Sequence, residues 1–188
     1  MLKPEYPIAT ERLLLRPFES DDYEPLLAIL SNPEVMRFLE SGPEGPDEVR
    51  ASLETKLNRT ALRREGDWLQ LAVVPREGGT MVGFVTLIWV SREHRQGEIG
   101  FIFHPDHHGR GYATEATEAV LPLAFDGLDL HRVIGRCDAR NLASARLLER
   151  LGMRREAHLI ENEVIKGAWT DELVYALLDR EWRSPGAS

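Results

Sequence analysis

The segment at residues 98–116, EIGFIFHPDHHGRGYATEA, constrains the fold more strongly than any other part of the chain. An apolar strand pattern ends at His104-Pro105, and a helical pattern begins at Tyr112 directly after a glycine-containing turn. Gly109 and Gly111 lack the Cβ atoms that would keep a ligand away from the backbone. The free N–H groups and the positive dipole end of the helix then favour an anion such as a phosphate or pyrophosphate.

Two glycines alone also fit a tight turn that caps a core helix, so this interpretation stays open beside the anion site. Dinucleotide-binding folds and P-loop folds are excluded because the chain lacks the sequence motifs that these folds require. The chain has no G-x-G-x-x-G before a helix with an acidic residue about twenty positions further on, and it has no G-K-[ST].

Hydrophobic periodicity predicts the element order β-α-α-β-β-β-α-β-α-β-β. Strands are expected at residues 12–18, 68–74, 81–90, 98–103, 132–137, 154–165 and 169–178. Helices are expected after Ser20 or Asp21, after Pro46 or Asp47, over 112–125, and over 143–151 with Gly152 at the end. The strand–helix–strand unit at 98–137 is expected to be parallel. The fold class is therefore α/β, with a single domain at residues 1–183 and a flexible tail at 184–188.

The chain has 188 residues, a formal net charge of −8 and one cysteine, which cannot form an internal disulfide. Its apolar runs are far shorter than the ~20 residues of a membrane-spanning helix. The first residues carry acidic side chains and a proline where a signal peptide needs an apolar stretch. The acidic balance argues against bulk binding to nucleic-acid phosphates. We therefore expect a cytoplasmic protein with neither a membrane nor a nucleic-acid partner.

Several short motifs, in register along residues 10–182, resemble those of the GNAT N-acetyltransferases. Residues 108–113 (HGRGYA) resemble the family's [Q/R]-x-x-G-x-[G/A] loop for acetyl-coenzyme A. Residues 141–144 (NLAS) and 148–153 (LERLGM) resemble its N-x-x-S…LEKLGF segment. The RimJ/RimL-like branch is the most similar, on TERLLLRP at 10–17, GYATEA at 111–116, KGAWTD at 166–171, YALL at 175–178 and EW at 181–182. Residues 31–66 carry no recognised motif.

The resemblance implies a mixed central β-sheet flanked by helices, with acetyl-coenzyme A (acetyl-CoA) as co-substrate and an amine as acceptor. In such enzymes two parallel strands splay apart, and the pantetheine arm lies between them. Backbone groups of Ile102, Phe103 and His104 would hold the arm, and one N–H near Phe103 would polarise the thioester carbonyl. Asn141 would bond the pantetheine amide, and Ser144 would lie near the sulfur. The pyrophosphate would be bound by the loop residues His108, Gly109, Arg110, Gly111, Tyr112, Ala113 and Thr114.

Two residues depart from the family pattern. His108 replaces the usual Gln or Arg at the head of the loop, which puts its phosphate contact in question. Leu148 replaces a tyrosine that in many relatives protonates the leaving thiolate, and a leucine cannot do so. Ser144 is then the best candidate acid, or at least a hydrogen-bond donor to the thiolate. A serine that satisfies backbone groups in the first turn of its helix is an equal alternative.

Transfer to an amine needs the neutral amine as nucleophile. An N-terminal α-amine, with a pKa of about 7.7–8.0 against about 10.4 for lysine, needs only a modest base. Among the strand carboxylates Glu163 is favoured as this base, Glu98 is second, and Glu161 shares a strand face with Glu163. Each of these residues is alternatively a solvated charge at a strand edge.

The histidine-rich turn at residues 104–108 suggests a metal site. No second ligand pair with zinc-like spacing occurs elsewhere, so we expect no metal. Cys137 shares strand parity with Val133 and Gly135, which indicates a core position. No base is apparent beside it, so an acyl-cysteine mechanism is not favoured.

These patterns predict an N-acetyltransferase that moves an acetyl group from acetyl-CoA to a primary amine by direct attack. The RimJ/RimL-like branch favours a protein N-terminal α-amine of the ribosomal-protein type as acceptor. A small-molecule amine, such as an antibiotic or a polyamine, is the first alternative. A catalytically silent acyl-CoA sensor is the second, and a generic nucleotide binder is the third. The acyl group and the formation of a homodimer are left open.

Overall fold

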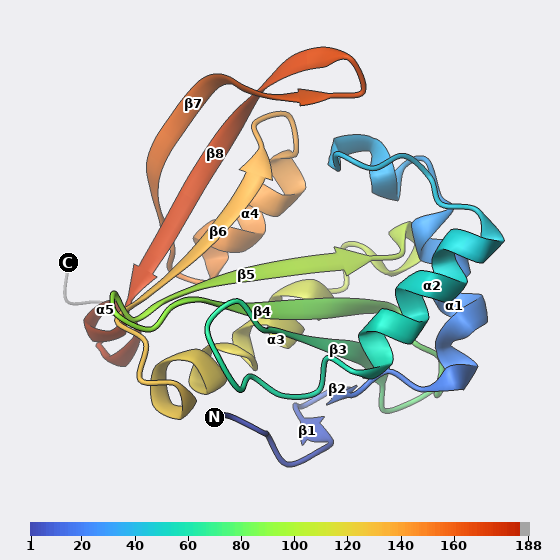
Figure 1. Cartoon of the computed structure of the whole chain (residues 1–188), viewed down its shortest axis with the longest axis horizontal. Coiled ribbons are helices and arrows are strands. Elements are labelled where there is room, and N and C mark those ends of the chain that lie inside the picture. Colours follow the sequence, from blue (N-terminus) through green and yellow to red (C-terminus); the bar gives the residue numbers. More distant parts are fainter. Residues whose placement is uncertain (185–188) are drawn as a thin grey trace.

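The computed structural model describes residues 1–184, so the predicted tail at 184–188 lies outside the described residues from 185 onward. Its eight strands form one sheet in the order β1-β2-β3-β4-β5-β6-β8-β7 (Figure 1). The strands are β1 (Ile8–Ala9), β2 (Leu13–Arg16), β3 (Trp68–Pro75), β4 (Gly83–Ser91), β5 (Gln96–Phe103), β6 (Arg132–Asp138), β7 (Arg154–Ile165) and β8 (Ala168–Leu178). The helices are α1 (Tyr23–Leu30), α2 (Pro46–Leu57), α3 (Tyr112–Glu118), α4 (Leu142–Arg150) and α5 (Asp179–Arg183).

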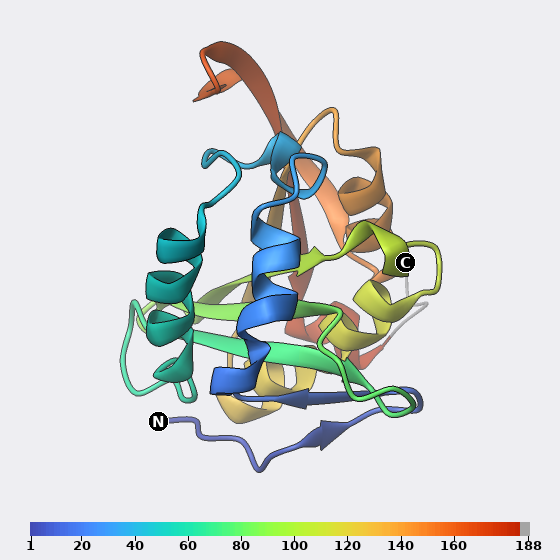
Figure 2. The same cartoon turned by 90° about the vertical axis from the view of Figure 1, so that its right-hand side faces the viewer.

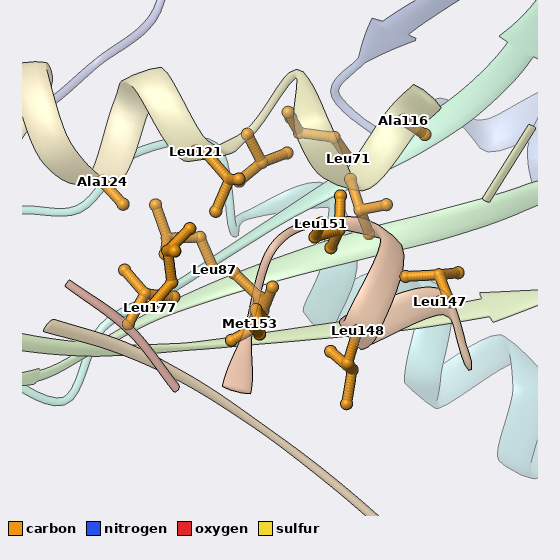
Figure 3. Packing of buried hydrophobic residues seen from close by; sticks show 14 of the residues in the cluster. Leu71, Leu87, Ala116, Leu121, Ala124, Leu147, Leu148, Leu151, Met153 and Leu177 are labelled. Carbon is orange, nitrogen blue, oxygen red and sulfur yellow. The ribbon is translucent and has the colours of Figure 1, made fainter. Parts of the chain in front are cut away.

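Helices cover both faces of the sheet, which confirms the predicted α/β class. On one face α1 and α2 lie side by side (Figure 2) and bury Ala72, Val74 and Phe84 of the sheet. On the other face α3 and α4 pack over a larger cluster that includes Leu71 and Leu87 (Figure 3). Strand residues alternate between the two faces, so β3 and β4 contribute to both clusters.

The predicted element order and the parallel pairing of β5 with β6 are confirmed. The last hairpin turns at Lys166 and Gly167, whose φ angles are +52° and +81°. Two successive left-handed residues are typical of the tight turn that suits the twist of paired strands. Gly152, with φ +79°, follows the end of α4 as predicted.

The helix predicted at 112–125 is shorter than expected. Helix α3 ends at Glu118, and an irregular helical turn at Leu123–Gly127 follows. Pro122 lacks the N–H that would bond the carbonyl of Glu118, which explains the interruption. The two-residue strand β1 and the one-turn helix α5 were not predicted, because elements this short leave no hydrophobic period.

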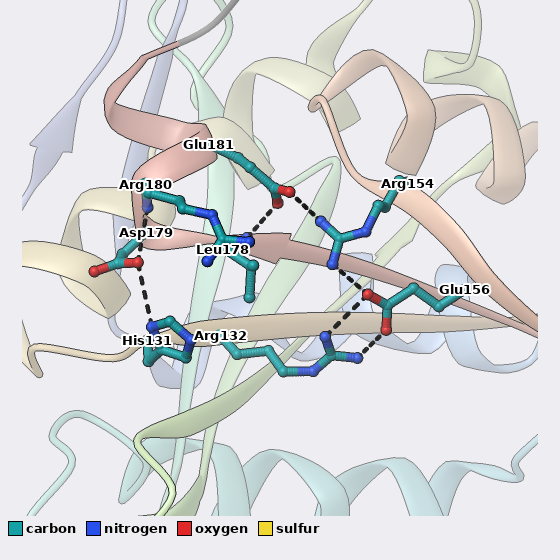
Figure 4. Close-up of polar contacts among 8 residues, drawn as sticks. All are labelled: His131, Arg132, Arg154, Glu156, Leu178, Asp179, Arg180 and Glu181. Carbon is teal, nitrogen blue, oxygen red and sulfur yellow. Dashed lines mark hydrogen bonds and ion pairs between the residues drawn. The ribbon is translucent and has the colours of Figure 1, made fainter. Parts of the chain in front are cut away.

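Helix α5 is joined to the sheet by ion pairs (Figure 4). Glu156 on β7 contacts Arg132 on β6 and Arg154 on β7, and Arg154 also contacts Glu181 on α5. Glu181 in turn accepts the backbone N–H of Leu178 at 2.9 Å.

Among residues 1–184, no helix is both long enough and apolar enough to cross a membrane.

Candidate active site

Strands β5 and β6 pair over only part of their length. Residues 96–99 pair in parallel with residues 132–135. Beyond that point β5 stays with β4 as far as Phe103, whereas β6 stays with β8 as far as Asp138. The two strands therefore diverge toward their carboxyl ends, as Figure 1 shows. The wedge that the resemblance implied is present.

A cleft of about 960 Å³ opens at this wedge. On the face of α3 and α4 it is lined by the loop before α3 and by the first turn of α4. On the face of α2 it is lined by side chains of β3 and β4 and by the turn Val35–Phe38. One cleft thus reaches both faces of the sheet.

Successive residues of β5 direct their backbone N–H and C=O groups alternately toward β4 and toward the wedge. His104 donates its N–H to the carbonyl of Val82 at 2.9 Å, at the end of the β4–β5 ladder. Antiparallel pairing alternates inward and outward groups, so Ile102 also turns its backbone groups toward β4. Phe101 and Phe103 turn theirs toward the wedge. The backbone groups that face the wedge are therefore those of Phe101 and Phe103.

Two histidines expected to contact the co-substrate have protein partners here. The carbonyl of His104 accepts the N–H of His107 at 3.0 Å, so both backbone groups of His104 are engaged. The ring Nε2 of His108 donates to the carbonyl of Phe103 at 3.1 Å. His108 therefore ties the head of the loop to the end of β5. The histidine that replaces Gln or Arg at this position therefore forms a structural hydrogen bond within the protein and needs no phosphate partner.

The loop before α3 presents a row of open N–H groups. Gly109 and Gly111 have φ angles of +73° and +79°, which side-chain-bearing residues rarely adopt. Within residues 1–184, the backbone N–H groups of residues 109–114 donate to no protein acceptor. Such consecutive amides at a helix start form a concave anion site. The geometry fits the pyrophosphate of coenzyme A.

Two arginines lie near the open N–H groups of residues 109–114. Arg150, from the end of α4, lines the cleft with its Nη2 at 3.3 Å from Oγ1 of Thr114. Arg12 donates from Nη1 to the carbonyl of Arg110 at 2.9 Å. The side chain of Arg110 itself is not among the cleft-lining groups of the described residues. Arg150, which sequence reasoning missed, is therefore the cleft-lining arginine beside these amides.

Asn141 and Ser144 both line the cleft at the start of α4. Oδ1 of Asn141 accepts the N–H of Ser144 at 3.1 Å, which caps the helix and leaves Nδ2 as a donor. Among residues 1–184, the hydroxyl of Ser144 has no hydrogen-bond partner. The alternative in which this hydroxyl satisfies helix backbone is therefore not what the structure shows.

The carboxylates differ in position. Glu98 lines the cleft on the face of α2, beside Arg136 at 3.5 Å. Burial raises the pKa of Glu98, and Arg136 partly offsets this shift. Glu163 is not among the cleft-lining residues described here. The positive φ of Glu161, +48°, marks a bulge that interrupts the ladder between Leu159 and Glu163.

Other groups on the face of α2 were missed in the sequence. Gln70 and Thr86 are buried, and Nε2 of Gln70 donates to Oγ1 of Thr86 at 3.2 Å. Lys56 and Arg59 project into the same part of the cleft. A polar residue in the apolar run WLQLAVV was the only local signal for Gln70. No local sequence signal marked Lys56 or Arg59, because Lys56 lies at the end of a helix and Arg59 follows that helix.

Cys137 and Leu148 have locations that bear on the chemistry. Cys137 is half-buried and lines the cleft instead of lying fully in the core. Burial raises the pKa of its thiol to about 11, which keeps it protonated.

Leu148 is buried beneath Gly135, whose added Cβ would lie 2.5 Å from Cδ2 of Leu148. Among residues 1–184, no three His, Cys, Asp or Glu side chains are arranged to hold a metal.

A family model described as an acetyltransferase (GNAT) domain matches residues 12–154. The uncharacterized N-acetyltransferase YnaD of Bacillus subtilis is 32% identical over 177 residues, which cover 93% of this chain and 98% of YnaD. The spermidine N(1)-acetyltransferase of Vibrio cholerae is 28% identical over 161 residues, covering 85% of this chain and 89% of that enzyme. The crystal structure of a GNAT-family acetyltransferase from Bacillus anthracis has a TM-score of 0.83 at 30% identity, covering 96% of this chain and 100% of that one. The chain therefore belongs to the GNAT family and is an acetyl-CoA-dependent N-acetyltransferase.

Proposed function

We propose that the enzyme acetylates the N-terminal α-amine of a protein, of the ribosomal-protein type, by direct attack of that amine on acetyl-CoA. One observation carries the proposal. A single cleft joins the open N–H groups of residues 109–114 to the carboxylate of Glu98 through the wedge between β5 and β6. The two reactants can then approach one gap from opposite faces of the sheet. Direct transfer needs this arrangement, because both reactants are bound at once.

The residues of the wedge would hold the co-substrate. The N–H groups of residues 109–114 would bind the pyrophosphate, with Arg150 as a neighbouring cation. The N–H and carbonyl of Phe101 would pair with the pantetheine arm as with an added strand. Nδ2 of Asn141 would donate to a carbonyl of the arm. The N–H of Phe103 would receive the charge that develops on the thioester oxygen.

When bound, acetyl-CoA supplies an activated acyl group as a thioester. Glu98 accepts a proton from the attacking amine, directly or through a water, and the nitrogen forms the new N–C bond. The C–S bond breaks, and the hydroxyl of Ser144 hydrogen-bonds to the departing sulfur. We place Glu98 ahead of Glu163 because, of the two, Glu98 lines the cleft. Arg136, at 3.5 Å, favours the ionised form of Glu98.

A polyamine is the second candidate acceptor. Glu34, Glu44 and Glu98 line the cleft and could bind further ammonium groups. The Vibrio cholerae relative is a spermidine N(1)-acetyltransferase, which supports the same class of acceptor. The carboxylates are the specific observation in favour of this candidate.

The test is release of free thiol from acetyl-CoA with peptides and with spermidine, followed by mass spectrometry of the acetylated position. A higher kcat/KM for peptide α-amines than for spermidine supports the proposal. Acetylation of spermidine or of lysine side chains, with α-amines left unmodified, contradicts it.

A further inference from the structure

Two cations on the α2 side of the cleft have no part in the reaction described above. Lys56 lies near the end of α2 and is 8% exposed, and its Nζ donates to Oγ of Ser52 at 2.8 Å. Arg59 follows the helix, and its Nη1 donates to Oε1 of Gln70 at 2.7 Å. Within residues 1–184, neither side chain has a carboxylate oxygen within 4.0 Å. An ammonium has three donors and a guanidinium five, so both retain donors for a ligand.

Strand register puts both cations over the sheet face that carries Glu98. Directly paired residues form three rows across β3, β4 and β5, namely Trp68–Ile88–Glu98, Gln70–Thr86–Gly100 and Ala72–Phe84–Ile102. The guanidinium of Arg59 lies 4.7 Å from the ring centroid of Trp68, and Nζ of Lys56 lies 5.2 Å from that of Phe84. Neighbouring strands are about 4.8 Å apart. Arg59 therefore lies over β3, in the row of Glu98 and two strands away from it. Lys56 lies over β4, in the row of Ile102, which is four residues along β5 from Glu98.

The charges of Lys56, Arg59 and Glu44 do not balance. Burial lowers the pKa of Lys56 to about 8, and the nearby carboxylate of Glu44 favours the charged form. Burial also raises the pKa of Glu44, whose Oε2 is buried without a hydrogen-bond partner among the described residues. Of these three groups, Glu44 offsets one positive charge, and the guanidinium of Arg59 has no carboxylate of the described residues within 4.0 Å. A negatively charged ligand group would offset the cost of holding these cations away from bulk water.

We propose that Lys56 and Arg59 bind a carboxylate of the acceptor, so that the enzyme selects primary amines that also carry a carboxylate. This inference rests on the proposed transfer to a primary amine and adds the substrate class. The amine lies at Glu98 and the carboxylate lies over β3 and β4. An acidic side chain next to a protein N-terminus has this chemistry, and so does a free amino acid. A polyamine lacks it, and the two cations repel its ammonium groups.

The experiment compares matched acceptors with the full-length enzyme and acetyl-CoA. Two peptides begin Ser-Glu and Ser-Gln and are otherwise identical, and free glutamate and spermidine complete the set. We expect kcat/KM to be at least about tenfold higher for the Glu peptide, because hydrogen bonds between a cation and a carboxylate are stronger than those between a cation and a neutral amide. Activity on the peptide without activity on glutamate assigns the carboxylate to a protein, and the reverse result assigns it to a free amino acid.

Three variants identify the residues responsible. Lys56→Met and Arg59→Met should each reduce the Glu-to-Gln ratio toward one through a higher KM for the Glu peptide, with the KM for acetyl-CoA unchanged. Lys56→Arg should restore part of the ratio, because it restores the charge. Arg50→Met is the matched control, since Arg50 lies on α2 outside the cleft lining of the described residues.

Two results would overturn the inference. A ratio unaffected by either Met variant contradicts the assignment of Lys56 and Arg59, and the unchanged KM for acetyl-CoA shows that the variants are folded. Spermidine as the best acceptor contradicts the substrate class while leaving amine acetylation intact. No thiol release with any amine contradicts the proposed function together with this inference.

Discussion

The side chains of Arg12 and Glu115 join the start of β2 to the first turn of α3. Nε and Nη2 of Arg12 lie 2.7 and 2.6 Å from Oε2 of Glu115. Oε1 of the same carboxylate accepts the backbone N–H of Arg12 at 2.9 Å and the hydroxyl of Thr10 at 2.6 Å. Arg12 and Glu115 therefore link residues 10–17 to residues 111–116, and the N-terminal segment supports the loop that we propose binds the pyrophosphate.

We expect Glu115→Ala to weaken acetyl-CoA binding although Glu115 does not face the cleft in the described structure. The change removes the acceptor for Thr10 and Arg12, which should lower the free energy of unfolding by about 1–3 kcal/mol and loosen the loop. Urea denaturation and calorimetric titration with acetyl-CoA measure the two effects. Glu118→Ala, on the exposed side of the same helix, is the control and should change neither.

Gly111→Ala should abolish most of the affinity for acetyl-CoA. The φ of Gly111 is +79°, and an added Cβ would lie 3.2 Å from Nη2 of Arg12. Gly66→Ala provides the same backbone strain, with φ +86°, at a site outside the cleft. Both variants should lose roughly 1–2 kcal/mol of stability. Equal acetyl-CoA affinities in the two variants would show that the loop does not bind the co-substrate.

Glu98→Gln should lower kcat about 10²- to 10⁴-fold and leave the affinity for acetyl-CoA unchanged, because a general base acts on the amine and not on the thioester donor. Glu163→Gln should leave kcat near the wild-type value. Steady-state kinetics with a peptide acceptor distinguish the two carboxylates. The opposite ranking would return the role of the base to Glu163.

The pH profile should report on Glu98 and Arg136. Burial raises the pKa of Glu98, so kcat/KM should fall with decreasing pH at a value above the ordinary glutamate pKa. Arg136 favours the ionised carboxylate at 3.5 Å. Arg136→Gln should therefore move the acidic limb to higher pH, whereas Arg76→Gln, in an exposed turn, should leave it in place. A limb that stays unchanged in Arg136→Gln would exclude Glu98 as the titrating group.

The local features of the site were readable from the sequence. Gly109 and Gly111 mark left-handed positions that only glycine adopts easily, and the strand–turn–helix order around them follows from periodicity over a few residues. The parallel pairing of β5 and β6 follows from the intervening helix. These inferences needed only contacts between neighbours in the chain.

Only the tertiary structure decided which side chains share the cleft. Glu98 and Glu163 look alike as strand carboxylates, but the strand order places Glu98 on β5, beside the wedge, and Glu163 on the edge strand β7. The engagement of His104 depends on Val82, and the register of three strands puts Lys56 and Arg59 over the same sheet face as Glu98. Such contacts join residues far apart in the chain. Local propensity therefore carries no record of them, and burial and strand register determine them together.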